Sequence, residues 1–197
     1  MRRDIVDSQL AAYHEASHAV IGLWLRRKVR RVEIDPLRPG NGQVLFERWS
    51  LLDIEPKDKT SALLVWNHAL SNAKGQAKIL LAGPLAEAKL LRTPLRSLGS
   101  RSDLESTLEI LHFLEDVRGR LSNFTEIGSD YSRNFNERLR RQTRRLIGVP
   151  KIWRAICLLA DDLLVWHELE GDEIATTVQW AFDAEGQTHL LLDRESP

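Results

Sequence analysis

The sequence has little cysteine, no long apolar run and no net charge. Cys157 is the only cysteine among 197 residues, so the chain forms no internal disulfide, which favours a reducing compartment. We expect its side chain to be buried as a small apolar group. The uncharged apolar runs, such as residues 19–25, are far shorter than the ~20 residues of a membrane-spanning helix. The opening MRRDIVDSQ does not resemble a signal peptide. We therefore expect a soluble, cytoplasmic protein.

The charges of the chain cancel. Lys and Arg number 28, as do Asp and Glu, so no global electrostatic attraction to nucleic acid or to an anionic membrane is expected. We therefore predict neither as a partner. Two basic clusters remain, at residues 26–31 and 138–145. The second falls in a segment with a helical pattern, which favours a solvated helix face or an oligomer contact over nucleic-acid binding.

The sequence also lacks the phosphate-binding loop G-x-x-x-x-G-K-[ST], so nothing in it predicts ATP binding. Its composition, 43% hydrophobic and 28% charged, is that of a globular protein with a sizeable core. We predict a single domain over residues 1–197, with an active-site part in 1–118 and a helical part in 133–185.

The segment His14-Glu15-Ala16-Ser17-His18 carries the clearest chemical signal. Two histidines four residues apart share one face of a helix, so both imidazoles can reach one metal ion. Glu15 is turned around the helix from them. In zinc peptidases with this spacing, the two imidazoles bind Zn²⁺ and the carboxylate accepts a proton from water. The competing interpretation is a pair of hydrogen-bonded structural histidines.

The motif also has a helical context. Asp7 or Ser8 is the expected N-cap, and a dense apolar pattern continues beyond the motif to Leu25 without a proline.

A catalytic zinc site needs a third protein ligand and an open fourth position. Asp103 is one candidate, since Ser102 and Glu105 form a capping-box pattern that places Asp103 in the first turn of a helix. The helix N-terminus favours an ionised carboxylate there. An aspartate that only stabilises the helix dipole is the simpler alternative, and Glu87 or Glu105 would be the ligand in a thermolysin-like arrangement. The other downstream histidines considered are His68, His112, His167 and His189.

The phrase AAYHEASHAVIGLWL resembles the active-site helix of FtsH-type proteases, the membrane-bound AAA+ zinc proteases, with Ser17 in place of the family's glycine. LGSRSDLEST is similar to the family segment that supplies the third ligand, which implies Asp103. LLAGPLAEAKLL resembles the preceding helix, which implies that Glu87 supports the site or packs beside it and is not a ligand. LLADDLLVWHELEGDEI is similar to the C-terminal helices, so the resemblance covers about residues 10–178.

The expected fold is mainly α, a helical bundle with a small β-hairpin, as in the FtsH-type peptidase domain. VRRVEID and QVLFERW alternate like strands, and VRRVEIDP also matches a family phrase. Residues 43–46 are a candidate substrate-binding edge, with an ordinary hairpin packed on the helix as the alternative. Helices are expected at 60–89, with a break or kink at Gly83-Pro84, and at 133–147, 151–166 and 171–182, with a loop at 119–132.

The resemblance implies a zinc-dependent metalloendopeptidase that hydrolyses unfolded or extended polypeptides without its own ATPase. In this interpretation His14, His18 and Asp103 hold Zn²⁺ and Glu15 is the catalytic base. A homo-oligomer, a hexamer in the family, or a separate ATPase would be the partner. The alternative is a non-catalytic zinc-binding or assembly module related to the peptidase domain.

Overall fold

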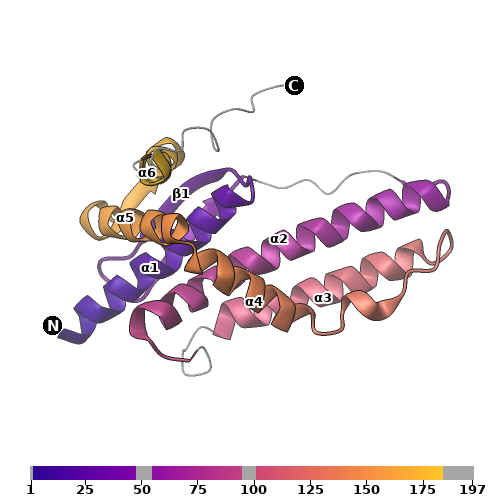
Figure 1. Ribbon diagram of the computed structural model, residues 1–197, viewed down its shortest axis with the longest axis horizontal. Helices are drawn as coiled ribbons and strands as arrows, with labels where there is room; N and C mark the ends of the chain where they lie inside the picture. The colour runs from indigo at the N-terminus through magenta and orange to yellow at the C-terminus, as the bar shows by residue number, and fades with distance from the viewer. Residues whose placement is uncertain (1, 48–54, 95–100, 184–197) are drawn as a thin grey trace.

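The computed structural model describes residues 2–47, 55–94 and 101–183, which form six α-helices and a three-stranded antiparallel sheet (Figure 1). The helices are α1 (Arg2–Trp24), α2 (Lys59–Leu91), α3 (Arg101–Leu121), α4 (Phe135–Gly148), α5 (Pro150–Trp166) and α6 (Gly171–Asp183). The strands are β1 (Val29–Ile34), β2 (Gly42–Phe46) and β3 (Glu168–Glu170), and a short 3-10 helix spans Ser129–Tyr131. The prediction of a mainly helical fold is confirmed at this level. Among the described residues, no helix is long and apolar enough to span a membrane.

Helix α1 is the central element, in contact with α2, α5, β1 and β2. Its buried face carries alanines at positions 12, 16 and 19, all fully buried, so neighbouring backbones can approach closely. The helix begins at Arg2, so the predicted N-cap at Asp7 or Ser8 is wrong. No proline or glycine lies between Arg2 and Ser8, and the helix therefore extends through both polar residues.

Helices α2 and α3 lie side by side and extend away from the sheet, and α4 packs on α2 (Figure 1). A capping box starts α2: the Asp58 carboxylate accepts the backbone N–H of Ser61, whose hydroxyl accepts the backbone N–H of Asp58. The helix continues to Leu91 as one element that includes Pro84, so, of the break or kink predicted at Gly83-Pro84, the break does not occur. Pro84 is buried, and its packing offsets the backbone hydrogen bond that proline removes.

The predicted hairpin is present, but the sheet has one strand more. β2 pairs with β1 in antiparallel register from Ile34↔Gly42 to Val29↔Phe46. β3 pairs with the other side of β1, which leaves β2 at the edge in the strand order β2-β1-β3. The prediction of a hairpin alone therefore missed β3, because three residues are too few to show strand alternation.

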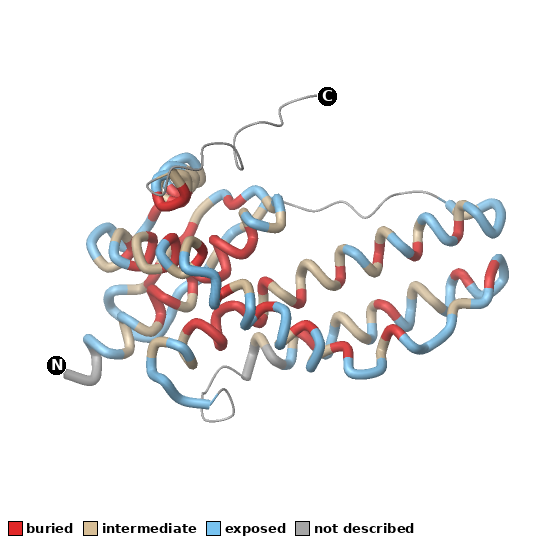
Figure 2. The backbone as a smooth tube through the Cα atoms, in the orientation of Figure 1, coloured by how far each residue is buried: buried red, intermediate tan, exposed pale blue. Residues whose placement is uncertain are grey.

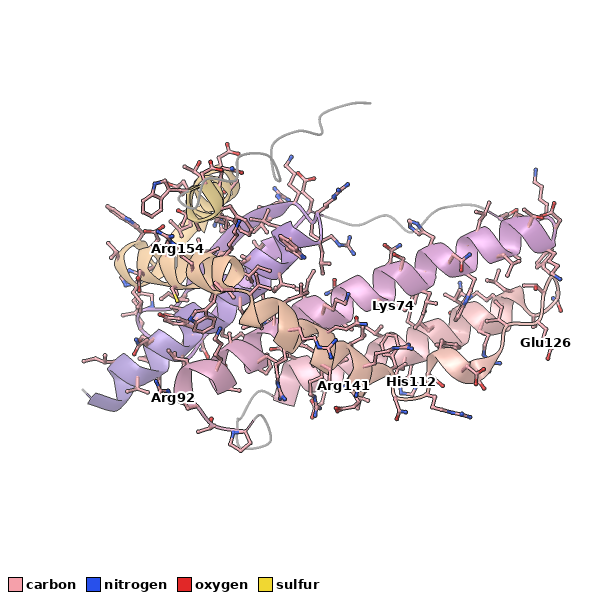
Figure 3. All side chains as sticks on the ribbon, in the orientation of Figure 1. Lys74, Arg92, His112, Glu126, Arg141 and Arg154 are labelled. Carbon is pink, nitrogen blue, oxygen red and sulfur yellow. The ribbon has the colours of Figure 1, made fainter. Side chains whose placement is uncertain are left out.

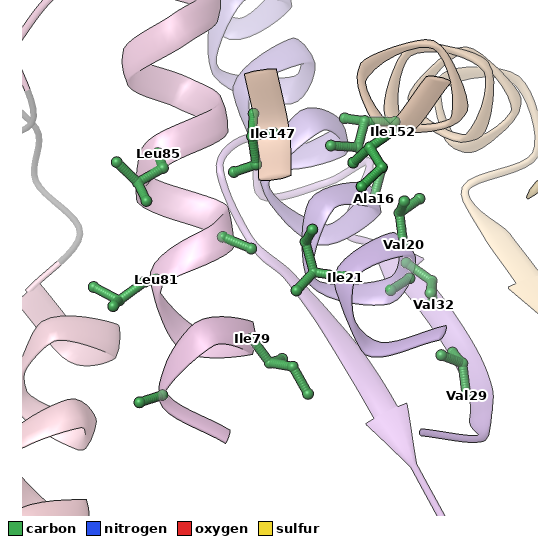
Figure 4. Packing of buried hydrophobic residues seen from close by; sticks show 14 of the residues in the cluster. Ala16, Val20, Ile21, Val29, Val32, Ile79, Leu81, Leu85, Ile147 and Ile152 are labelled. Carbon is green, nitrogen blue, oxygen red and sulfur yellow. The ribbon is translucent and has the colours of Figure 1, made fainter. Parts of the chain in front are cut away.

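The core lies where α1 meets α2, β1, α5 and the end of α4. Figure 4 shows Ile21 of α1 between Val32 of β1 and Ile79 of α2, and Ile152 of α5 beside Ala16. Buried positions also follow the inner faces of α2 and α3 along the extended pair (Figure 2). There Trp66 is buried as expected, with its ring against Tyr131 at 4.8 Å between centroids. Cys157, expected to be buried, is partly exposed.

Candidate metal centre

Three side chains that the sequence analysis selected lie together in the structure. His14 and His18 of α1 and Asp103 of α3 place one ligand atom each within 4.8 Å of one another. The Asp103 Oδ2 atom is 2.8 Å from His14 Nε2 and 3.6 Å from His18 Nε2. The two imidazoles meet edge to face, with ring centroids 4.6 Å apart. Two nitrogens and one carboxylate oxygen therefore face a common point.

The outward nitrogens of both imidazoles are held by acceptors on α2. His14 Nδ1 lies 2.5 Å from Oε1 of Glu87, and His18 Nδ1 lies 2.7 Å from the Ile79 carbonyl oxygen. Because a carbonyl oxygen can only accept, His18 Nδ1 carries a proton, which leaves Nε2 as the nitrogen that can bind a metal ion. The Glu87 carboxylate orients His14 in the same way. Metal-binding histidines in proteins are commonly fixed by such partners on the far nitrogen.

Ser17 lies between the two histidines and fits the helix without disturbance. Its side chain is fully buried, and its hydroxyl donates to the backbone carbonyl of His14 at 2.7 Å. The polar atom is therefore satisfied within the helix.

Glu15 lies beside these ligands without joining them. It is only 8% exposed and lines the same cleft. Burial raises the pKa of its carboxyl group, and the neighbouring His18 and His14 oppose this shift only in part. A carboxylate with a raised pKa is a better proton acceptor than an ordinary surface glutamate.

The electrostatics of the histidines are dominated by the carboxylates around them. Burial would lower the pKa of His14, but hydrogen bonds to Asp103 and Glu87 outweigh it and raise the pKa to about 10. Burial would raise the pKa of Asp103, but hydrogen bonds to His14 and His18 lower it below its usual range. The carboxylates of Asp103 and Glu87 therefore favour positive charge at this point, whether a proton on His14 or a metal ion.

The cluster opens into a cleft of about 690 Å³ between α1, α2 and the sheet. The edge strand β2 forms one wall with Gln43, Val44 and Phe46, and α2 forms the other with Ile79 and Leu80. The structure therefore brings the predicted substrate-binding edge, residues 43–46, to the same cleft as the predicted ligands.

The donor set fits a zinc ion. Two imidazole nitrogens with fixed tautomers and one carboxylate are a common ligand set of catalytic zinc, and the cleft leaves room for a fourth ligand. Of the two thermolysin-like alternatives, Glu105 is exposed and outside the cluster, and Glu87 contacts the far nitrogen of His14. Among the described residues, no group of possible metal ligands includes His68, His112 or His167. His112, for example, lies on α3 in the extended helix pair (Figure 3). The Ser102 side chain and His189 lie outside the described residues.

Sequence reasoning missed one contributor to the site, the Ile79 carbonyl oxygen. A backbone acceptor has no signature in the sequence, and only the packing of α2 on α1 identifies it.

Neither a scan against protein-family models nor a search of curated proteins finds a match for this chain. The functional argument therefore depends on the geometry of the cluster and its cleft.

Proposed function

We propose that the chain is a zinc-dependent metalloendopeptidase, similar to the peptidase module of FtsH-type proteases, that hydrolyses unfolded or extended polypeptides. The observation that carries the proposal is the convergence of His14, His18 and Asp103 in an open cleft that also contains the buried Glu15. A structural pair of histidines would not require a buried carboxylate beside it, because an unpaired buried charge is costly.

The proposed mechanism gives each residue one task. His14 and His18, through Nε2, and Asp103, through Oδ2, would hold Zn²⁺. A zinc ion there supplies a Lewis acid that polarises the substrate carbonyl and lowers the pKa of water. The Glu15 carboxylate accepts the proton of the attacking water and then donates it to the nitrogen of the leaving amine. Glu87 and the Ile79 carbonyl keep both imidazoles in the tautomer that this requires.

The edge strand β2 gives the proposal a substrate class. Its outer side is unpaired among the described residues, and it borders the metal cleft. A substrate added as a further strand would be held with its backbone extended past the zinc ligands. Folded proteins keep their backbone in their own hydrogen bonds, so we expect unfolded polypeptides as substrates. For folded substrates, the natural partner would be a separate ATPase or further copies of the chain in a homo-oligomer. The single cysteine favours the cytoplasm as the compartment.

The rival function is a zinc-binding or assembly module without peptidase activity. Structural zinc sites are usually closed by four protein ligands. In the described part of this chain three residues form the group, at the wall of a cleft. This difference favours catalysis.

The test is digestion of one substrate in unfolded and in folded form. Purified protein with zinc is incubated with each form, with and without ATP and with a chelator. We expect cleavage of the unfolded form alone, independent of ATP and abolished by the chelator. Zinc-loaded protein that cleaves neither form would support the non-catalytic module, and ATP-dependent digestion of the folded form by the chain alone would contradict the proposed substrate class.

A further inference from the structure

We propose that Asp7, at one end of the metal cleft, binds a lysine or arginine side chain of the extended polypeptide, about three residues from the bond that is cleaved. The inference rests on the proposed function, because it takes the substrate to lie along β2 past the zinc ligands. It adds a preference for basic residues to the substrate class, and it names the side chain that selects them.

The contacts between α1 and the hairpin fix the order of residues along the cleft. A Cβ atom placed on Gly40, in the turn between β1 and β2, would lie 3.9 Å from the Cβ atom of Asp7. A Cβ atom on Gly42, where β2 begins, would lie 3.1 Å from Cδ of Glu15. At the end of β2, Phe46 packs against α1 about two turns beyond Glu15. A polypeptide that follows β2 therefore passes Asp7 at one end, the zinc ligands in the middle and Phe46 at the other end.

Asp7 lies on the same face of α1 as the zinc ligands. It precedes His14 by seven residues, which is about two turns of helix, and both residues line the cleft. Seven residues of helix rise about 10 Å, whereas an extended polypeptide advances about 3.3 Å per residue. Asp7 is therefore about three substrate residues away from the metal centre, along the path that β2 defines.

Acidic side chains dominate the charge of the cleft. Among the described residues that line it, none is a lysine or an arginine. The lining carboxylates are those of Asp7, Glu15, Glu87 and Asp103. Asp103 and Glu87 contact His14. Glu15 is the proposed base beside them. Asp7 alone has no task at the metal centre, and the lining of the cleft supplies no cation to pair with it.

A cationic side chain of the substrate is the complement that Asp7 lacks. Hydrogen bonds between an ammonium or guanidinium group and a carboxylate are stronger than those between neutral groups. Asp7 is partly buried, so solvent and salt screen its charge less than that of an exposed carboxylate. A second metal ion is not the complement, because the group of possible metal ligands among the described residues does not include Asp7.

The opposite end of the cleft is apolar. Val44 and Phe46 of β2 line it, together with Leu80 of α2. None of these side chains can pair with a charge. A basic residue of the substrate is therefore favoured on one side of the cleaved bond only, and the same residue on the other side should bring no gain.

The preference is tested first by binding, which does not require catalysis. Zinc-loaded Glu15→Gln protein is titrated with three fluorescent peptides, blocked at both ends, that differ only in having lysine, glutamine or glutamate at one position. We expect the lysine peptide to bind about tenfold more tightly than the glutamate peptide at low salt, with a smaller difference at high salt. In the same background, Asp7→Asn should abolish this difference and Asp7→Lys should reverse it.

The matched control is Asp130→Lys. It makes the same change of charge in the 3-10 helix, at an exposed position outside the lining of the cleft, and should keep the preference for lysine. Circular dichroism and zinc content establish that each variant is folded. Equal affinity for the three peptides, or no binding of any, would overturn the proposal, as would a preference for lysine that survives Asp7→Lys.

Mapping of cleavage sites separates this inference from the proposed peptidase activity. Wild-type protein digests unfolded casein, and mass spectrometry locates the cleaved bonds. Lysine and arginine should be enriched about three residues from these bonds, on one side only, and Asp7→Lys should replace them there by aspartate and glutamate. Cleavage without such enrichment would overturn the role of Asp7 and leave the peptidase intact. The binding preference without any cleavage would support the role of Asp7 and contradict the peptidase.

Discussion

Gly83 of α2 lies directly against the imidazole of His14. A Cβ atom at position 83 would fall within 3.0 Å of the Nε2, Cε1 and Cδ2 atoms of the ring, closer than real Cβ contacts. Glycine is therefore required here for close approach between two helices. Because Gly83 has no side chain, the His14 imidazole can contact both Asp103 and Glu87, which lies one turn further along α2.

Gly83→Ala is accordingly expected to displace His14 and weaken zinc binding by about tenfold or more. Gly75→Ala is the matched control on the same helix, because a Cβ at position 75 meets nothing within 4 Å. It should leave zinc binding unchanged and stabilise the helix by roughly 0.5–1 kcal/mol. Zinc titration and thermal unfolding of both variants measure the two effects. Equal zinc affinity in the two variants would show that the contact with His14 is unimportant.

The third ligand is tested by comparing two carboxylates of α3. Asp103→Ala should lose zinc, since its Oδ2 faces both Nε2 atoms, whereas Glu105→Ala should keep one zinc per chain. Elemental analysis of the purified variants reads the stoichiometry. Zinc retained in Asp103→Ala and lost in Glu105→Ala would move the site to the thermolysin-like arrangement.

Glu87→Gln tests the orientation of His14. Its amide keeps the shape of the side chain but removes the charge that faces Nδ1. We expect one zinc at saturation and an affinity lower by about 10- to 100-fold, as is usual for such supporting partners. Competition with a chromophoric chelator measures the affinity. Complete loss of zinc at saturating concentration would instead make Glu87 a ligand.

Zinc binding should release protons. Before zinc binds, the pKa of His14 is raised to about 10. This side chain is therefore protonated at a pH of about 7. Zinc requires the neutral imidazole and therefore displaces about one proton. Affinity should rise with pH and fall as acid returns the proton. Calorimetry in buffers of different ionisation enthalpy counts the protons released; heats that are the same in every buffer would contradict the raised pKa.

The sequence allowed much of the fold and the site to be predicted, because the signals were local. The spacing of His14 and His18 follows from helix geometry, and the strands β1 and β2 follow from alternation. β3 was missed, because its place in the sheet depends on pairing with β1 far away in the sequence. The helix over residues 60–89 was predicted, but its continuity through Pro84 could not be predicted, since burial of the ring is a tertiary effect. The selection of Asp103 depended on a resemblance, and the structure adds its distances to both imidazoles.

The most direct measurement of the central claim is casein hydrolysis by wild type and Glu15→Gln at equal zinc content. Glutamine preserves the shape of the buried side chain but cannot accept the proton of the attacking water. The proposed mechanism predicts one zinc in both proteins and a rate at least about 10²-fold lower in the variant. Equal rates at equal zinc content would show that Glu15 is not the base and would contradict the mechanism.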